Sequence, residues 1–124
     1  VDPRTSRDFI HVDDVCAAFI MAAVKMHPSL YGENFNIGTG IKTTIAELVD
    51  VTRCLFNVTA EPKFGTMEGR AWDLAEWYSD PRKAIEQIGW KPLVKLEDGL
   101  RSMALWVARL TDTELIAASK KNIK

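Results

Sequence analysis

The sequence predicts an α/β fold, in the form of an α+β-like fragment with about four helices and two or three short strands. Apolar residues at helical spacing predict the helices, and a short run closed by a glycine turn predicts a strand. The chain has 124 residues, of which 47% are hydrophobic. Because a chain of this length buries only one modest core, a single domain is expected.

The first helix is expected over residues 13–26, where apolar residues recur at helical spacing. Asp13 or Asp14 can cap this helix by accepting hydrogen bonds from the backbone amides at its start. Further on, the sequence Asn-Phe-Asn-Ile at residues 34–37 precedes Gly-Thr-Gly at residues 38–40. This pattern predicts a buried strand followed by a glycine turn.

Three further helices carry clear boundary signals. The sequence Thr-Ile-Ala-Glu at residues 44–47 fits a capping box, in which the threonine and glutamate side chains each bind a free backbone amide. A third helix is expected after Asp80 as the cap and Pro81 as the first helical residue, and Gly89 ends it. The fourth is expected over residues 96–110.

Composition and charge exclude several classes of protein. The 16 basic and 17 acidic residues are spread through the chain and give a net charge of -1, so nucleic acid is not expected as a partner. The longest nearly apolar stretch, residues 15–24, is about half of the roughly 20 residues that span a bilayer. The first six residues show no secretory signal, so a cytoplasmic protein is expected. Cys16 and Cys54 have no metal-ligand spacing and are expected to be ordinary reduced thiols.

Two motifs carry most of the functional information. The first motif is Arg-Asp-Phe-Ile-His-Val-Asp-Asp at residues 7–14. The second motif, residues 70–84, begins with Arg-Ala-Trp-Asp and contains Tyr-Ser-Asp-Pro-Arg-Lys-Ala from residue 78. Their order and spacing resemble the C-terminal half of an extended short-chain dehydrogenase/reductase (SDR). The resemblance is to the NAD(P)-dependent nucleotide-sugar epimerases, which are isomerases, and dehydratases, which are lyases, and it runs from residue 5 to about residue 107.

This resemblance implies a Rossmann-type fold that lacks its dinucleotide-binding half. In the family, the strand that ends in the Asn-Ile-Gly-Thr-Gly turn joins the edge of the large parallel sheet of that half. The strand at residues 34–37 would then have lost its neighbour. Residues 1–110 are expected to be the C-terminal substrate-binding part, and residues 111–124 a terminal helical turn with a frayed basic tail.

The resemblance also implies three substrate-binding residues. Arg7 and Arg70 match family arginines that contact the diphosphate, because a guanidinium presents a fork of donors to phosphate oxygens. Asp73 matches a carboxylate that can accept two hydrogen bonds from the ribose hydroxyls. Without the surrounding motifs, Arg7 with Asp8 would be interpreted as a local surface ion pair, and Arg70 with Asp73 could equally be a solvated salt bridge in a loop. Trp72 stands where many family members have glycine, and it can either stack on the ligand or fill the contact with the missing domain.

The chemistry of hydride transfer is not encoded in this chain. The family uses a glycine-rich turn after the first strand and a Tyr-x-x-x-Lys pair. Residues 38–40 supply no third glycine, and neither Tyr31 nor Tyr78 is followed four residues later by lysine. No catalytic or cofactor-binding residue is therefore assigned, and NAD or NADP is expected only in the intact parent enzyme. No metal site is expected, since His11 and His27 cannot be assembled into one.

The functional prediction is a nucleotide-sugar-binding portion of an NAD(P)-dependent epimerase or dehydratase that is not catalytically competent alone. The expected partners are a nucleotide-diphosphate sugar and the missing N-terminal Rossmann half, with a homodimer as a further option. One alternative is a stand-alone structural or protein-interaction module that dimerises through an exposed sheet edge. Another is a fragment of a non-sugar SDR reductase, which would keep the fold without the diphosphate site.

Overall fold

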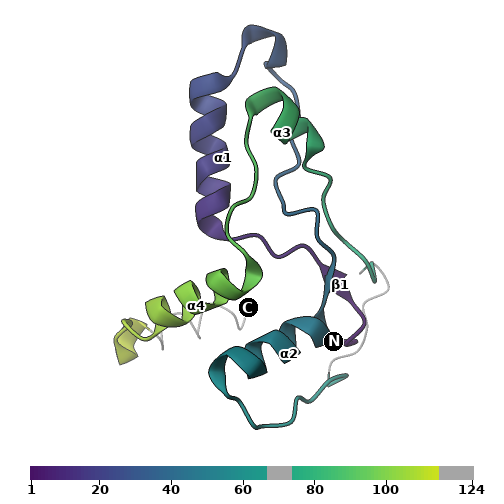
Figure 1. The fold of residues 1–124 in the computed structure, drawn as a ribbon, viewed down its shortest axis with the longest axis vertical. Helices are drawn as coiled ribbons and strands as arrows, with labels where there is room; N and C mark the ends of the chain where they lie inside the picture. Colours follow the sequence, from purple (N-terminus) through teal and green to yellow (C-terminus); the bar gives the residue numbers. More distant parts are fainter. Residues whose placement is uncertain (67–73, 115–124) are drawn as a thin grey trace.

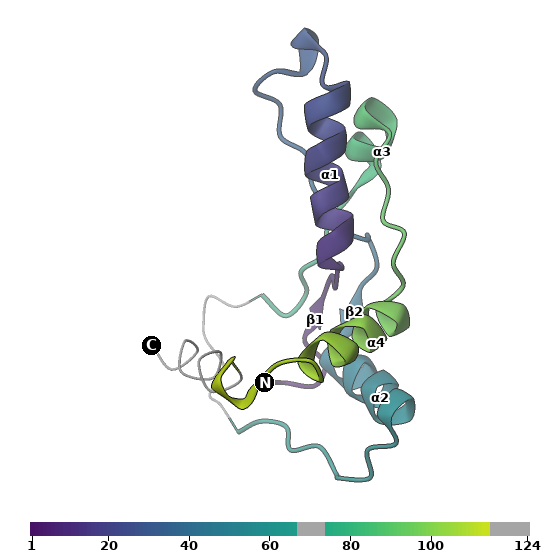
Figure 2. The ribbon, with the colours of Figure 1, turned by 90° about the vertical axis from the view of Figure 1, so that its left-hand side faces the viewer.

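The structure is a computed structural model that describes residues 1–66 and 74–114. Within these residues the elements are β1 (Ser6–Arg7), α1 (Val12–Lys25), the 3-10 helix η1 (Pro28–Leu30), β2 (Thr43–Thr44), α2 (Ile45–Phe56), α3 (Arg82–Ile88) and α4 (Leu96–Val107). Helices α1 and α3 lie side by side at one end of an elongated molecule, and α2 and α4 lie together at the other (Figures 1 and 2). The predicted α/β fragment with four helices and short strands is confirmed.

Strand β1 lies between two other segments of the chain. It pairs with β2 in antiparallel fashion, with Ser6 opposite Thr44. On its other side Ser6 forms a parallel bridge with Glu76. There the Ser6 amide donates to the Ala75 carbonyl at 2.8 Å, and the Ser6 carbonyl accepts from the Trp77 amide at 3.2 Å. The start of the first motif is therefore joined to the middle of the second.

The predicted strand at residues 34–37 does not form. Among the described residues, this segment makes no backbone–backbone hydrogen bond, and the two strands that do form lie elsewhere. Phe35 and Ile37 nevertheless pack against the core, as a buried segment should. The prediction was wrong because a strand is defined by hydrogen bonds to a neighbouring backbone, which no described residue supplies here.

The cap of α1 also differs from the prediction. His11 occupies the cap position, and its Nδ1 accepts a hydrogen bond from the Asp13 amide at 3.2 Å. Asp14 is buried instead, and its two carboxylate oxygens accept from the amides of Leu93 and Val94, both at 3.0 Å. Asp14 is therefore a tertiary contact between α1 and the segment before α4.

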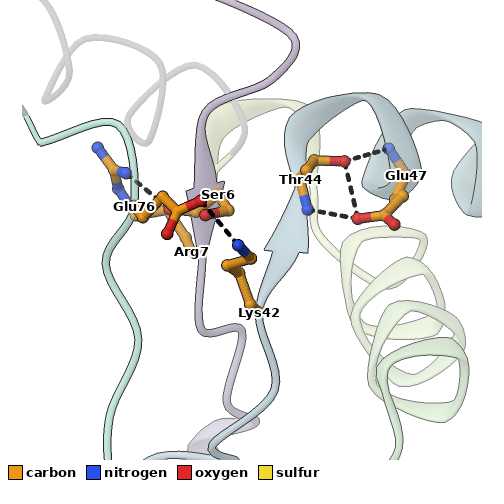
Figure 3. Close-up of polar contacts among 6 residues, drawn as sticks. All are labelled: Ser6, Arg7, Lys42, Thr44, Glu47 and Glu76. Atoms are coloured by element: carbon orange, nitrogen blue, oxygen red, sulfur yellow. Dashed lines mark hydrogen bonds and ion pairs between the residues drawn. The ribbon is translucent and has the colours of Figure 1, made fainter.

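The starts of α2 and α4 and the end of α3 are as predicted, whereas the start of α3 and the end of α4 differ by one and three residues. The capping box of α2 is confirmed, with the Thr44 amide donating to Glu47 Oε2 at 2.7 Å and the Glu47 amide donating to Thr44 Oγ1 at 3.1 Å (Figure 3). Helix α3 begins one residue later than predicted, at Arg82, because Pro81 and not Asp80 is at the cap position, although the Arg82 amide still donates to Asp80 Oδ1 at 3.1 Å. The helix ends at Ile88, and Gly89, with a φ of 68°, is its C-terminal cap as predicted. Helix α4 is three residues shorter than expected, ending at 107 rather than 110.

The fully buried apolar residues gather at the α1/α3 end of the molecule. They are Ala18, Ala84, Ile88 and Trp90. The indole Nε1 of Trp90 donates to the Asp14 carbonyl at 2.8 Å, so the largest core side chain is also hydrogen-bonded. This pairing satisfies the one polar atom of the indole, which is costly to bury alone.

Two further expectations concern the cysteines and membrane-spanning helices. Cys16 and Cys54 are both free thiols on exposed residues. No helix within the described ranges is both long and apolar enough to span a lipid bilayer.

Candidate functional site

The predicted diphosphate residue Arg7 is held by backbone atoms of Ser6, which directly precedes the first motif, and of Leu74 in the second motif. Its Nη1 donates to the Ser6 carbonyl at 2.7 Å and to the Leu74 carbonyl at 3.0 Å. Figure 3 shows Arg7 on β1, with Lys42 and Glu76 from the flanking segments close by. Because two carbonyls fix one nitrogen of the fork, the orientation of the guanidinium is set by the fold.

The other two predicted substrate residues, Arg70 and Asp73, lie outside the described residues, as does Trp72. The described chain resumes at Leu74, which follows Asp73 directly in the sequence and accepts the hydrogen bond from Arg7. The structure therefore brings the first motif to the described part of the second motif. It does not test the roles of Arg70 and Asp73.

A salt bridge joins the outer segments across β1. Lys42 Nζ lies 2.7 Å from Glu76 Oε1, between the residue before β2 and the segment that bridges to Ser6 (Figure 3). Both side chains are about half exposed, at 45% and 59%. An ion pair this open to solvent contributes little to stability, so it supports the arrangement without determining it.

Asp8 makes the densest set of polar contacts near Arg7. Its Oδ1 accepts from the amide of Thr39, at 2.9 Å, and from the Thr39 hydroxyl. Its Oδ2 accepts from the Gly40 amide at 3.0 Å, and from the amide and hydroxyl of Ser79 at 3.2 and 2.7 Å. Five donors therefore share the roughly four lone-pair sites of this carboxylate, and three of the five lie on Oδ2. One side chain thus connects the first motif, the glycine turn and the second motif.

The environment of Asp8 is tight and favours its charged form. A Cβ on Gly38 would lie 2.2 Å from Ser79 Oγ and 2.6 Å from Asp8 Oδ2, so only glycine fits there. Burial acts to raise the pKa of Asp8, but the hydrogen bonds from Thr39, Ser79 and Gly40 together outweigh it. The pKa of Asp8 therefore lies below its ordinary value.

Sequence reasoning missed Asp8 as a site residue and considered it only as an ion-pair partner of Arg7. The available signal was indirect. The Gly-Thr-Gly turn at residues 38–40 exposes backbone amides that need acceptors, and Asp8 is an acceptor within a motif. Nothing in the local pattern links position 8 to position 39 or 79.

A separate apolar cleft of about 670 Å³ lies between the start of α1 and helix α4. Its apolar lining consists of Phe9, Ile10, Val12, Leu48, Val94, Leu96, Leu100, Met103 and Trp106. His11 and Gly99 also line the cleft and lie close together, since a Cβ on Gly99 would be 3.1 Å from His11 Cδ2. Arg7 and Asp8 do not line this α4 cleft.

The arrangement suits anion binding better than metal binding. No group of three or more His, Cys, Asp or Glu side chains within residues 1–66 and 74–114 could hold a metal ion. The one histidine in the first motif, His11, uses its Nδ1 as a helix cap. The chemistry that the described residues offer is a fixed guanidinium on a hydrogen-bonded strand.

Comparison with known proteins now identifies the family. The family model described as GDP-mannose 4,6 dehydratase matches residues 2–103. The chain belongs to this family. The predicted resemblance to a part of an extended SDR is confirmed, and the fold is a partial SDR fold.

Relatives of this SDR chain include nucleotide-sugar 4-epimerases. UDP-glucose 4-epimerase of Mycolicibacterium smegmatis is 35% identical over 99 residues, which is 80% of this chain and 30% of the relative. UDP-arabinose 4-epimerase 1 of Arabidopsis thaliana is 33% identical over 106 residues, 85% of this chain and 25% of the relative. The chain therefore spans less than a third of the length of these relatives.

Solved structures give the same picture. UDP-glucose 4-epimerase of Thermotoga maritima, crystallised with UDP-glucose, has a TM-score of 0.74 and 33% identity, covering 88% of this chain and 33% of that one. The enzyme WbmF of Bordetella bronchiseptica, in complex with NAD+ and UDP, has a TM-score of 0.66 and 30% identity, covering 86% and 30%. The SDR chain thus corresponds to a part of each of these enzymes, one of which is in complex with NAD+ and UDP.

Proposed function

We propose that this SDR chain forms one side of a nucleotide-sugar site, as the C-terminal substrate-binding part, residues 1–110, of an epimerase or dehydratase. In this proposal Arg7 and Arg70 bind the diphosphate and Asp73 binds the ribose. The observation that carries it is the contact of Arg7 with Leu74, next to Asp73 in the sequence. The related structures with bound UDP-glucose and UDP support the substrate class.

The geometry at Arg7 suits a diphosphate. Its Nη1 is used by two backbone carbonyls, which fixes the plane of the guanidinium before any ligand arrives. A planar guanidinium in a fixed position binds phosphate oxygens with directional, charge-assisted hydrogen bonds. Less conformational entropy is lost on binding when the donor is already oriented.

The redox half of the reaction belongs to a different part of the intact enzyme in this proposal. Related structures contain NAD+, but this chain has neither the glycine-rich turn nor the Tyr-x-x-x-Lys pair that would hold and use it. Its residues therefore do not fit a nicotinamide cofactor, and we assign it no cofactor and no catalytic step. The chain binds and orients substrate and does not turn it over alone.

The surface of α1 supports a further part of the proposal, a large intramolecular partner. Four apolar side chains on α1 are strongly exposed, namely Val12, Phe19, Ile20 and Val24, with Phe19 at 74%. Residues 34–37, whose backbone pairs with no described strand, belong to the same end of the molecule, where Phe35 and Ile37 pack against the core that α1 contributes to. A neighbouring sheet would cover the exposed apolar face of α1 and would supply a strand to pair with residues 34–37. The expected occupant is the dinucleotide-binding half of an extended SDR.

The test of the ligand assignment is the affinity for UDP-glucose. Replacing Arg7 or Arg70 by alanine removes a charge-assisted contact worth roughly 1.5 to 3 kcal/mol, which is about ten- to a hundredfold in affinity. Arg82→Ala is the matched control, since Arg82, the first residue of α3, pairs with Asp80 rather than with the predicted ligand. Unchanged affinity in Arg70→Ala would remove Arg70 from the site. Equal losses of affinity in all three variants would show that the loss reflects the change in net charge and not a specific contact.

A second candidate function rests on the exposed apolar face of α1. If the chain acts as a stand-alone module, this face and residues 34–37 pair two copies into a homodimer. Solution mass combined with a UDP-glucose titration separates the two candidates. A tight dimer that does not bind the nucleotide sugar supports the module, whereas a species that binds it supports the substrate-binding part.

A further inference from the structure

We propose that Asp8 is the positioning residue of this site, setting where Arg7 lies relative to the second motif without touching the ligand itself. This inference rests on the proposed function and goes beyond it, since it assigns a role to a residue outside the predicted ligand set. It starts from the observation that the carboxylate of Asp8 binds two separate parts of the chain, the turn at residues 39–40 and Ser79.

The two oxygens of Asp8 divide their partners. Oδ1 accepts from Thr39, in the turn that follows residues 34–37, and Oδ2 accepts from Gly40 and from Ser79. Residue 8 immediately follows Arg7, so a movement of the Asp8 backbone moves Arg7 with it. The carboxylate thereby fixes β1 against two segments that are remote in sequence.

Ser79 makes this connection relevant to the ligand site. The stretch from residue 74 to residue 79 is held to the first motif at two places. Its first half pairs with Ser6 through the backbone of Ala75 and Trp77, and its end bonds to Asp8 through Ser79. Two attachment points fix both the position and the direction of the segment that begins right after Asp73.

Close packing explains why this contact cannot loosen without moving the strand. Gly38 has no room for a Cβ, because Ser79 Oγ and Asp8 Oδ2 already occupy that space. Asparagine at position 8 would turn an amide NH2 toward N–H and O–H donors, and those donors would lose their acceptor. The network therefore depends on a carboxylate at this position.

The test is a double-mutant cycle read by UDP affinity. UDP is titrated into the wild-type 124-residue chain and into Asp8→Asn, Arg7→Ala and the double variant, followed by NMR. We expect Asp8→Asn to weaken UDP binding about tenfold, and the double variant to bind no worse than Arg7→Ala alone, because Asp8 acts through Arg7. Asp50→Asn, an exposed aspartate on α2, is the matched control and should bind like the wild type.

The outcomes separate this inference from the proposed function. If the wild type does not bind UDP, the proposed function fails. If the wild type binds and Asp8→Asn binds equally well, or if the loss of affinity in Asp8→Asn adds fully to that in Arg7→Ala, the positioning role of Asp8 is overturned.

Should Asp8→Asn fail to fold, Ser79→Ala replaces it, since the Ser79→Ala substitution deletes the hydroxyl donor and keeps the backbone amide. A folded Ser79→Ala that binds UDP like the wild type would equally overturn the inference, and a three- to tenfold loss supports it.

Discussion

The α1/α3 end and the β1 region, defined as residues 6–8, 38–44 and 74–79, are stabilised by different forces. At the α1/α3 end the buried residues are apolar apart from Asp14, with Ile88 and Trp90 almost fully inaccessible. In the β1 region the buried side chain is the hydroxyl of Ser6, and the contacts are hydrogen bonds to Asp8 and a solvent-exposed salt bridge. The first region should respond to changes in volume, and the second to changes in hydrogen-bond geometry and charge.

The largest effect is expected from Trp90→Ala. It removes the largest buried side chain and leaves the Asp14 carbonyl without its indole donor. The expected loss is about 3 to 5 kcal/mol in the free energy of unfolding, measured by urea denaturation. Trp106→Ala is the control, because Trp106 is 60% exposed and should change stability by about 0.5 kcal/mol or less. Equal losses in both variants would mean that the core does not lie at the α1/α3 end.

A smaller effect is expected from Gly38→Ala in the β1 region. The added Cβ would overlap Ser79 Oγ and Asp8 Oδ2, so the turn must shift, at a cost of about 1 to 3 kcal/mol. The same substitution in a Ser79→Gly background should cost less, since both contacting atoms of Ser79 are gone. If the background makes no difference to the thermal midpoint, the close approach of Gly38 and Ser79 is not real.

Asp8 should give the stability of the β1 region a dependence on pH. The folded-state pKa of Asp8 lies below its ordinary value of about 4, so its contribution to stability is present above that value and is lost as pH falls through the folded pKa. At pH 7, Asp8→Asn should cost about 1.5 to 3 kcal/mol. The difference from the wild type should shrink when unfolding is measured near pH 3. A difference that stays constant with pH would show that the charge of Asp8 is not what matters.

The capping box at the start of α2 should contribute less. Thr44→Ala removes the hydroxyl that accepts from the Glu47 amide, with an expected loss of about 1 kcal/mol in thermal denaturation. Thr43→Ala, one residue earlier on β2, is the control and should cost less because Thr43 is not the cap. The reverse order would place the helix start elsewhere.

The smallest effect is expected at Ser6. Its hydroxyl is buried and has no hydrogen-bond partner in the described part of the chain. Ser6→Ala removes an unsatisfied polar group, so stability should be unchanged or raised by a few tenths of a kcal/mol. A loss above about 1 kcal/mol in the same denaturation assay would mean that the hydroxyl is bonded in solution.

The same contrast explains which features could be predicted from the sequence. The capping box at Thr44 and the helix end at Gly89 were predicted because their partners lie within a few residues. The roles of Asp8 and Asp14 were not, because their partners lie 31 to 80 positions away and no local pattern identifies them. The strand at residues 34–37 was predicted from its composition, yet strand formation needs a neighbour that the described chain does not contain.

The central claim is that the β1 region forms one side of a nucleotide-sugar site. A titration of UDP-glucose into the isotope-labelled chain, followed by amide NMR shifts, tests it most directly. The account predicts shifts concentrated at residues 6–8 and 74–79, and an affinity that Arg7→Ala lowers about tenfold or more. Absent shifts, shifts confined to the residues of the α4 cleft, or an affinity that Arg7→Ala leaves unchanged would contradict it.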